Sequence, residues 1–341
     1  MASTKSRAHL APAAIEAAWT DLWSRLHAGH GMFGRAHTQT LVVLARQPSK
    51  ALDETLAAVS QSHPGRVVVL YLSPRAAGTD EVTLCGNPVA GLGSELVCVT
   101  ADAPVAEHWA ELVLPLLLPD VPVYLFVADP DVLDTPELSG LVDTVDHVVL
   151  DTATLEHPWA PWRPIFQHEG DLGLLDLAWI RTAGWREALA AVFDPEACLA
   201  LLPTLQSVAV AGSHAGSAHW LAAWLANRLD YRPDSGSAGA RWAARRRPPV
   251  VFGFERRAHG GLDRITLRFE GAEAVVRHGD GTVRAEVHQG TRLLATTELP
   301  RVGPDTAPQL SAALAEGFDP LFADAFRWLE LAHPAASDGA R

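Results

Sequence analysis

The spacing of apolar residues changes along this chain and predicts two kinds of sheet. In the first half, short continuous apolar runs alternate with segments of helical spacing. The expected strands are TLVVLA (40–45), RVVVLYL (66–72), EVTLCG (81–86), ELVCVT (95–100), VPVYLFVA (121–128) and DHVVLD (146–151). Continuous apolar strands separated by helices are typical of a largely parallel sheet that is covered on both faces.

Helical spacing in this half predicts the helices that would flank the sheet. The expected helices are AAIEAAWTDLWSRL (13–26), ALDETLAAVSQS (51–62), PVAEHWAELVLPLL (104–117) and TPELSGLV (135–142). In the first of them the apolar residues recur on one face, and they are Ile15, Trp19, Leu22, Trp23 and Leu26. The glycine- and histidine-rich segment 27–37 that follows is expected to be a flexible connection.

In the second half of the chain, the spacing of apolar residues predicts helices first and short alternating strands afterwards. A helix is expected to end at Asp194-Pro195, and SVAVAG (207–212) is expected to be a strand that precedes a helix over 217–229. Short alternating strands then predict an antiparallel sheet. They are VVFGFE (250–255), RITLRFE (264–270), AEAVVRHG (272–279), TVRAEVHQG (282–290) and RLLATTEL (292–299), and helices over 307–318 and 320–332 close the pattern.

Together these patterns predict an α/β protein of two domains. The N-terminal α/β domain, residues 1–156, has a largely parallel sheet with flanking helices. A crossing segment, 157–170, contains three prolines and no periodicity. The C-terminal α+β domain, 171–334, has the antiparallel sheet and includes a mobile arginine-rich loop over 232–249.

Composition excludes several classes of protein. The 341 residues carry a formal net charge of −13, which argues against binding to nucleic acid or to an anionic membrane. The start of the chain has no apolar core of signal-peptide length, and prolines interrupt the most apolar region, 111–128. We therefore expect a cytoplasmic protein. Cys85, Cys98 and Cys198 are scattered and are expected to be small buried apolar residues, with redox sensing as the alternative.

The stretch AGSHAGSAHW (211–220) resembles a phosphate-binding turn between a strand and a helix. It contains no lysine for a Walker A loop, and its two glycines do not make the dinucleotide fingerprint. Ser217 is expected to be the helix N-cap. Two interpretations stay open: a tight turn that permits close packing, or a sugar-phosphate site formed by Gly212, Ser213, Gly216 and Ser217.

No signature of a hydrolase or a metal site accompanies this turn. The chain has neither G-x-S-x-G nor H-E-x-x-H, and no cofactor or metal is predicted. The run RWAARRR (241–247) is either a solvated loop or a binding site for an acidic partner or a phosphate.

Tryptophan, arginine and aspartate are most concentrated in residues 157–186. This composition fits a sugar or phosphosugar site, a protein interface, or a core with ion-paired arginines. Upstream, His63 and Pro64 are expected to end a helix, and Arg66 is expected to bind the carbonyl groups at the end of that helix.

Four of these segments carry a family resemblance. SQSHPGRV (60–67), LLLPDVPVYLF (116–126), DLAWIRTAGWREALAAVFD (176–194) and SAHWLAAWLANRL (217–229) occur in an order that resembles the OpcA family over about residues 60–300. OpcA proteins are bacterial assembly proteins and activators of glucose-6-phosphate dehydrogenase. The most specific motif is DLAW-x-R-x-x-x-WR.

The resemblance implies a non-catalytic allosteric activator. Such a protein would bind glucose-6-phosphate dehydrogenase, favour its active oligomer and support the oxidative pentose phosphate pathway. The residues expected to bind the partner or orient the domains are Asp176, Trp179, Arg181, Trp185 and Arg186, followed by His63 and Arg66. Gly65 stands where many members of the family have cysteine, so control by a thiol is not expected.

Two other functions stay open at this point. One is an enzyme or sensor that binds a sugar phosphate through the 212–217 turn and Arg181 or Arg186. The other is a structural partner in a different complex.

Overall fold

The computed structural model describes residues 4–8, 17–18, 20–21, 24–25, 37–72, 81–89, 92–101, 109–129, 132, 136–166, 172–234, 237, 239–258, 261–303, 305–317 and 319–334. The chain forms two compact units, and we describe each by itself. Unit 1 comprises Met1–Asp151, Pro164–Leu175 and Thr306–Phe318. Unit 2 comprises Thr152–Arg163, Asp176–Asp305 and Asp319–Arg341.

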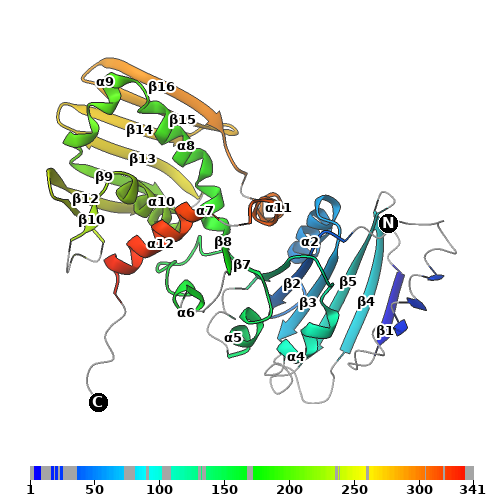
Figure 1. Ribbon diagram of the computed structural model, residues 1–341. Helices are drawn as coiled ribbons and strands as arrows, with labels where there is room; N and C mark the ends of the chain where they lie inside the picture. Colours follow the sequence, from blue (N-terminus) through cyan, green and yellow to red (C-terminus); the bar gives the residue numbers. More distant parts are fainter. Residues whose placement is uncertain are drawn as a thin grey trace, which may run out of the picture. The chain divides into compact units, whose positions relative to one another are not determined.

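Unit 1 is built on an eight-stranded sheet, called sheet A (Figure 1). Its strands are β1 (Thr4–Ala8), β2 (Thr40–Ala45), β3 (Arg66–Leu72), β4 (Glu81–Val89), β5 (Leu92–Ala101), β6 (Val123–Val127), β7 (His147–Leu150) and β8 (Gly173–Asp176). Its helices are α2 (Lys50–Ser62), α4 (Trp109–Val113), the 3₁₀ turn η1 (Leu114–Leu116), α5 (Pro136–Val142) and α11 (Thr306–Glu316). The short helix α6 (Trp162–Phe166) spans a boundary between the units.

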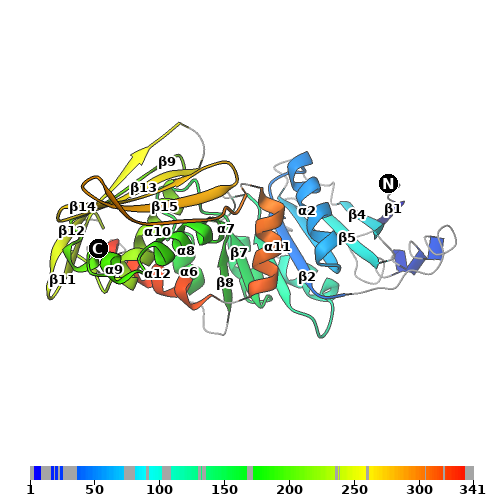
Figure 2. The same cartoon turned by 90° about the horizontal axis from the view of Figure 1, so that it is seen from above.

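The strand order of sheet A is β1-β4-β5-β3-β2-β6-β7-β8. Strands β5, β3, β2, β6 and β7 pair in parallel, whereas β4 and β1 add an antiparallel edge. Without that edge the strands follow the 3-2-1-4-5-6 order of a doubly wound Rossmann sheet. Every residue of β2 and β6 is buried, which requires cover on both faces. Helices α2 and α11 lie side by side in this unit (Figure 2).

Unit 2 is built on a second eight-stranded sheet, sheet B. Its strands are β9 (Ser207–Gly212), β10 (Arg232–Pro233), β11 (Arg241–Ala244), β12 (Arg247–Arg256), β13 (Leu262–Phe269), β14 (Ala272–His278), β15 (Thr282–Gln289) and β16 (Arg292–Pro300). Its helices are α7 (Leu177–Arg181), α8 (Ala183–Val192), α9 (Glu196–Leu199), the 3₁₀ turn η3 (Leu202–Thr204), α10 (Ala215–Arg228) and α12 (Pro320–Ala332).

The strand order of sheet B is β10-β11-β12-β9-β13-β14-β15-β16. Only β9 and β12 pair in parallel among the described strands of this sheet. Helices α8 and α10 pack on the sheet (Figure 2). Buried positions alternate with polar ones along β13 and β15, as expected for strands with one face toward a core.

The fold class predicted from the sequence is confirmed: a largely parallel sheet with helices precedes an α+β region with a largely antiparallel sheet. The predicted domain limits of 1–156 and 171–334 stay a prediction. The compact units differ from them most clearly at residues 306–318, which belong to unit 1. Most of the predicted helix 13–26 and of the segment 27–37 lies outside the described residues.

Two local predictions were wrong. The expected loop 232–249 contains β10, β11 and the start of β12, because Trp242 is fully buried and stacks on Phe252 at 5.8 Å. The helix expected to begin at Ser217 begins at Ala215 with His214 as its N-cap. Within the described part of the chain, no helix is both long and apolar enough to cross a bilayer.

Candidate functional site

Asp176 lies at the end of β8, where helix α7 begins. Its side chain is the N-cap of α7 and accepts a hydrogen bond from the Ala178 N–H at 2.8 Å. It also accepts one from Thr152 Oγ1 at 2.7 Å and one from Trp162 Nε1 at 2.9 Å. Trp220 Nε1 in turn donates to Thr152 Oγ1 at 2.9 Å. This Asp176 cluster, formed by Asp176, Thr152, Trp162 and Trp220, is entirely buried and positions the start of α7.

A second carboxylate, that of Asp319, organises the next part of the motif. Trp179 Nε1 donates to Asp319 Oδ2 at 2.6 Å, and Asp319 also caps helix α12 through the Leu321 N–H. The Arg186 guanidinium carbon lies 3.7 Å from the centre of the Trp179 ring, in cation–π geometry. Its Nη1 is 4.0 Å from Asp319 Oδ2. Trp179 and Arg186 therefore contribute to the internal structure of unit 2.

These contacts join the points where the chain enters unit 2. Thr152, Asp176 and Asp319 are the first residues of the three segments that make up this unit. Asp176 binds Thr152 directly, and Trp179, three residues further along, binds Asp319. The motif that resembles the family thus ties three distant segments together.

His63 and Arg66 belong to unit 1, whereas the contacts described above belong to unit 2. His63 is the C-cap of α2, as expected. Arg66 was expected to bind the carbonyl groups at the end of α2, which stays a prediction; its Nη1 donates to the Leu116 carbonyl at the end of η1, at 2.8 Å. Its Nε donates to Glu95 Oε2 at 2.7 Å, and both side chains are buried.

Gly65 has a packing role beside this ion pair. A Cβ at position 65 would fall inside van der Waals contact of the Gln39 carbonyl oxygen. Glycine therefore lets strand β3 begin close to the segment that enters β2. A cysteine at this position of this chain would require the backbone to shift.

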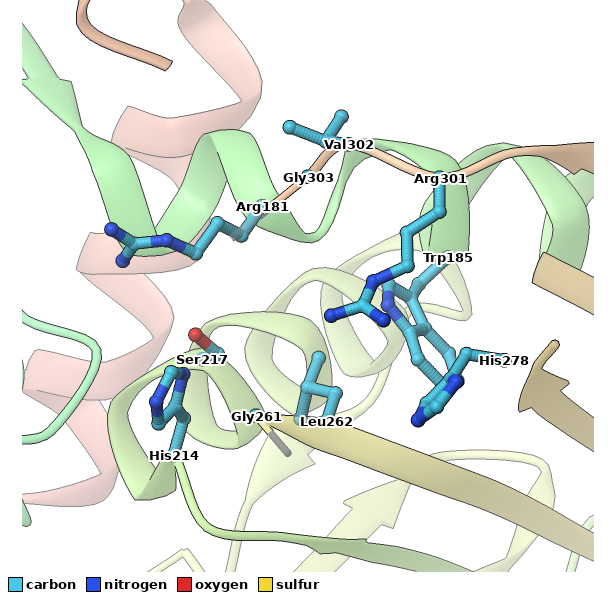
Figure 3. Close-up of a pocket in the computed structure, with 10 residues that line it drawn as sticks. All are labelled: Arg181, Trp185, His214, Ser217, Gly261, Leu262, His278, Arg301, Val302 and Gly303. Carbon is cyan, nitrogen blue, oxygen red and sulfur yellow. The ribbon is translucent and has the colours of Figure 1, made fainter. Parts of the chain in front are cut away.

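Arg181 and Trp185 line a cavity of about 350 Å³ in unit 2 (Figure 3). The side chains come from four parts of the unit: α7 and α8, the start of α10, the ends of β13 and β14, and the segment after β16. The lining residues are Arg181, Trp185, His214, Ser217, Gly261, Leu262, His278, Arg301, Val302 and Gly303. None of these described residues is acidic, so the lining presents cations and hydrogen-bond donors.

Close packing positions Arg301 at this cavity. Gly184 lets α8 approach the end of β16, because a Cβ there would lie only 2.9 Å from the Pro300 carbonyl oxygen. The Arg301 N–H donates to the Gly281 carbonyl at 2.9 Å. Both contacts fix the backbone from which the Arg301 guanidinium extends to the centre of the cavity in Figure 3.

The four residues of the predicted phosphate-binding turn have two different roles in the structure. Ser213 forms two hydrogen bonds with Gly261, through its N–H at 2.8 Å and its hydroxyl at 3.0 Å. Cβ atoms at Gly212 and Gly216 would collide with the carbonyl oxygens of Gly261 and Thr152. These three residues therefore serve close packing, and of the four only Ser217 is among the residues described as lining the cavity.

The Rossmann strand order implies a dinucleotide site at the carboxyl ends of β2 and β6. A cavity of about 320 Å³ lies there, lined in part by Gln47, Ser49 and Asp129. These residues do not fit a pyrophosphate. The turn from β2 to α2 contains no glycine, the Ser49 hydroxyl already accepts the Leu52 N–H at 3.1 Å, and Asp129 adds negative charge. A phosphate can approach such a turn closely only where glycine leaves room, where hydrogen-bond donors are free and where no carboxylate repels it.

A third group of side chains surrounds Trp159 in unit 2. His333 stacks on Trp159 with ring centres 3.9 Å apart, and the edge of His219 meets the same ring at 5.4 Å. Burial, assisted by the neighbouring His333 and His157, lowers the pKa of His219 to about 4. Burial and the neighbouring His157 and Arg163 lower the pKa of His333 to about 4. Both rings are therefore neutral at pH 7.

Sequence reasoning missed His214, His278 and Arg301. They lie at a helix N-cap, at the end of a strand and after the last strand of sheet B, and no motif connects them. The one signal available was the glycine-rich turn, which points to the start of α10. The other walls of the cavity depend on how sheet B brings distant strand ends together.

Solved structures that are similar to this chain include a reductase, a dehydrogenase and a super-repressor mutant, all at low similarity. Biliverdin reductase from Synechocystis sp. PCC 6803 is 12% identical, with 86% of this chain and 96% of that chain covered and a TM-score of 0.45. UDP-N-acetylglucosamine 3-dehydrogenase GnnA from Acidithiobacillus ferrooxidans is 13% identical, with 87% and 96% covered and a TM-score of 0.45. The super-repressor mutant of Gal80p from Saccharomyces cerevisiae is 9% identical, with 87% and 94% covered and a TM-score of 0.45. Likeness at this level says nothing about ligand or activity.

No curated protein matches the chain. Two family models do, and they follow each other along the sequence. Residues 56–164 match the N-terminal domain of a glucose-6-phosphate dehydrogenase subunit, and residues 172–326 match its C-terminal domain. Both are models of the OpcA family, and together they cover most of the chain. The chain therefore belongs to the OpcA family of glucose-6-phosphate dehydrogenase assembly proteins.

Proposed function

We propose that this protein is a non-catalytic assembly factor and allosteric activator of glucose-6-phosphate dehydrogenase, and that it supports the oxidative pentose phosphate pathway. The observation that carries the proposal is the pair of matched domains, both named for a subunit of that enzyme. The site supports it in a second way. The charged side chains of Asp176 and Arg66 are buried and hydrogen-bonded within their own units, so their role in the proposal is structural.

The proposed mechanism is linkage. A protein that binds the active assembly of the dehydrogenase better than the inactive one shifts the population toward activity. A tenfold shift requires a preference of only about 1.4 kcal/mol. No chemical step by the activator itself is needed.

We infer a positioning role for most of the residues that the sequence singled out. Asp176, Trp179 and Trp185 are at most 2% exposed, so contact with a partner would require them to leave their buried sites. Their proposed role is to hold the segments of unit 2 together and so to maintain the surface that a partner binds. His63 and Arg66 would do the same in unit 1.

The alternative of an enzyme or sensor that binds a sugar phosphate through the 212–217 turn is not favoured. It used the 212–217 turn with Arg181 or Arg186, but three of the turn residues serve packing and Arg186 lies on Trp179. The cytoplasmic location and the absence of nucleic-acid or membrane partners stay predictions.

The surface we choose for the test is the exposed arginine turn between β11 and β12. Arg245 and Arg246 are both exposed there, in a chain of net charge −13. Exposed like charges of this kind suit an acidic patch on a partner. Reversing them leaves the buried clusters untouched.

The experiment is the activity of the same organism's glucose-6-phosphate dehydrogenase against glucose 6-phosphate, with and without this protein. We expect a lower apparent KM or a higher kcat, and co-elution of the two proteins on size exclusion. The double variant R245E/R246E should weaken both effects, whereas R292E, an exposed change at the start of β16, should leave them unchanged. No effect of saturating wild-type protein, together with no co-elution, would overturn the proposal.

A further inference from the structure

We propose that the Arg301 cavity, defined by the ten lining residues given above, binds a phosphate ester of a small polar molecule. Neither family domain name assigns a ligand to this chain, so the inference goes beyond the proposed function. It rests on the contacts of unit 2 alone and is independent of whether the dehydrogenase is the partner.

The first observation is a buried hydroxyl with no hydrogen-bond partner. Ser217 is the third residue of the 14-residue helix α10, and its side chain is 1% exposed. Its Oγ forms no hydrogen bond with any described residue, although a buried hydroxyl normally has a partner. Ser217 is among the residues that line the cavity, and Figure 3 draws its hydroxyl near His214. A ligand oxygen in the cavity would satisfy it.

The second observation is the sign of the charge around that hydroxyl. Arg181 and Arg301 both line the cavity. In Figure 3 the Arg301 guanidinium extends to the centre of the lining residues, between His214 and His278, whereas the Arg181 guanidinium points away from Arg301. Arg301 forms no ion pair with the described part of the chain, and the nearest carboxylate to His278, that of Asp263, is 3.9 Å away and not in the lining. The positive end of helix α10 adds to the same field.

The Arg301 guanidinium, two imidazoles and a hydroxyl, with Arg181 as a second arginine in the lining, match the several oxygens of a phosphate group. A carboxylate offers fewer oxygens than this set of donors can bind. The absence of acidic lining residues in this part of the structure, within a strongly acidic protein, indicates that the charge is specific to the cavity.

The third observation concerns the rest of the ligand. Trp185, Leu262 and Val302 provide an apolar wall, and the volume of about 350 Å³ is within the range of small-molecule sites. An inorganic phosphate alone would leave this wall without a contact. We therefore assign a phosphate ester whose organic part lies against Trp185.

The test is isothermal titration of the full-length chain, without any dehydrogenase, using three probes: glucose 6-phosphate, glucose and inorganic phosphate. We expect the phosphate ester to bind with a Kd of about 1 mM or tighter, inorganic phosphate to bind more weakly, and glucose not to bind. R301Q should weaken the ester by about tenfold or more, because it removes a charged donor. R292Q, outside the cavity, is the matched control.

Ser217→Ala gives a readout that a purely structural serine would not. It should raise the melting temperature of the ligand-free protein, because it removes an unsatisfied buried hydroxyl, and weaken ester binding by roughly threefold or more. Circular dichroism checks that each variant is folded. No saturable binding of the ester, equal binding of ester and inorganic phosphate, or unchanged binding in both S217A and R301Q would overturn the proposal. Because no dehydrogenase is present, these results are separate from the activation assay.

Discussion

Glu95 in unit 1 and Asp176 in unit 2 are buried carboxylates that are stabilised differently. Glu95 binds Arg66 of the segment SQSHPGRV (60–67), and Asp176 begins the segment DLAWIRTAGWREALAAVFD (176–194); both segments belong to the family resemblance. Glu95 forms an ion pair with the buried Arg66 guanidinium at 2.7 Å. Asp176 accepts hydrogen bonds from neutral groups, among them the Thr152 hydroxyl and the Trp162 indole. The first arrangement balances charge with charge, and the second surrounds a charge with dipoles.

This comparison shows what the two motifs do. In each, the residue types that suggest a site instead hold the core of one unit. The segment 176–194 has a second role. Arg181 and Trp185 line the cavity, whereas Asp176 and Trp179 form hydrogen bonds inside unit 2. A motif can therefore identify a family through its structural residues while the ligand-facing positions are only a part of it.

The largest effect is expected from Arg66→Met, which leaves Glu95 buried without its cation. The free energy of unfolding should fall by about 3–5 kcal/mol. The double variant Arg66→Met/Glu95→Met should recover most of this loss, because it removes both charges. Urea unfolding followed by circular dichroism measures both. Equal losses in the single and double variants would contradict the role of the ion pair.

Asp176→Asn should have a smaller effect, about 2 kcal/mol, because the shape is retained and one amide oxygen still accepts hydrogen bonds. The amide NH₂ group would face donors such as Trp162 Nε1 and could not bind them. The same urea experiment gives the difference, with the exposed Asp194→Asn as control. If the free energy of unfolding fell as much as in Arg66→Met, the hydrogen bonds to Asp176 would stabilise the protein as strongly as the Arg66–Glu95 ion pair, which would contradict the prediction.

The half-buried histidines near Trp159, His219 and His333, extend the comparison to ionisable groups whose surroundings disfavour the charged form. The pKa of His219 is lowered to about 4, so between about pH 4 and 6.5 the unfolded chain binds more protons than the folded chain. Stability should therefore fall as pH decreases through this window, by about 1–2 kcal/mol after allowance for partial exposure of His333. His219→Asn should reduce the slope of stability against pH. A flat profile in both proteins would contradict the assignment.

The smallest effect is expected where Trp179 and Arg186 contact Asp319. Arg186→Lys keeps the charge but loses the planar contact with the Trp179 ring, which should cost about 0.5–1 kcal/mol. Thermal unfolding measures it, with the exposed Arg268→Lys as control. A change indistinguishable from the control would mean that Arg186 contributes nothing beyond its charge.

Most strands and helices could be predicted because they depend on local patterns. Continuous apolar runs became β2, β3 and β6, and alternating runs became β13 to β16. The strand β11 was missed because its single anchor, Trp242, lies among arginines and glycines that are typical of loops. Its burial depends on Phe252, which is ten residues away in the chain.

The sequence by itself determined the class of fold, the order of its elements and the family, because these depend on hydropathy and on residues that are near each other in the chain. Only the tertiary structure decided that Asp176 and Arg66 are internal, that the glycines near α10 serve packing, and that Ser217 meets Arg301 at one cavity. The physical reason is that burial and charge balance are properties of a place in space. The residues that share the Arg301 cavity come from separate elements that only folding brings together.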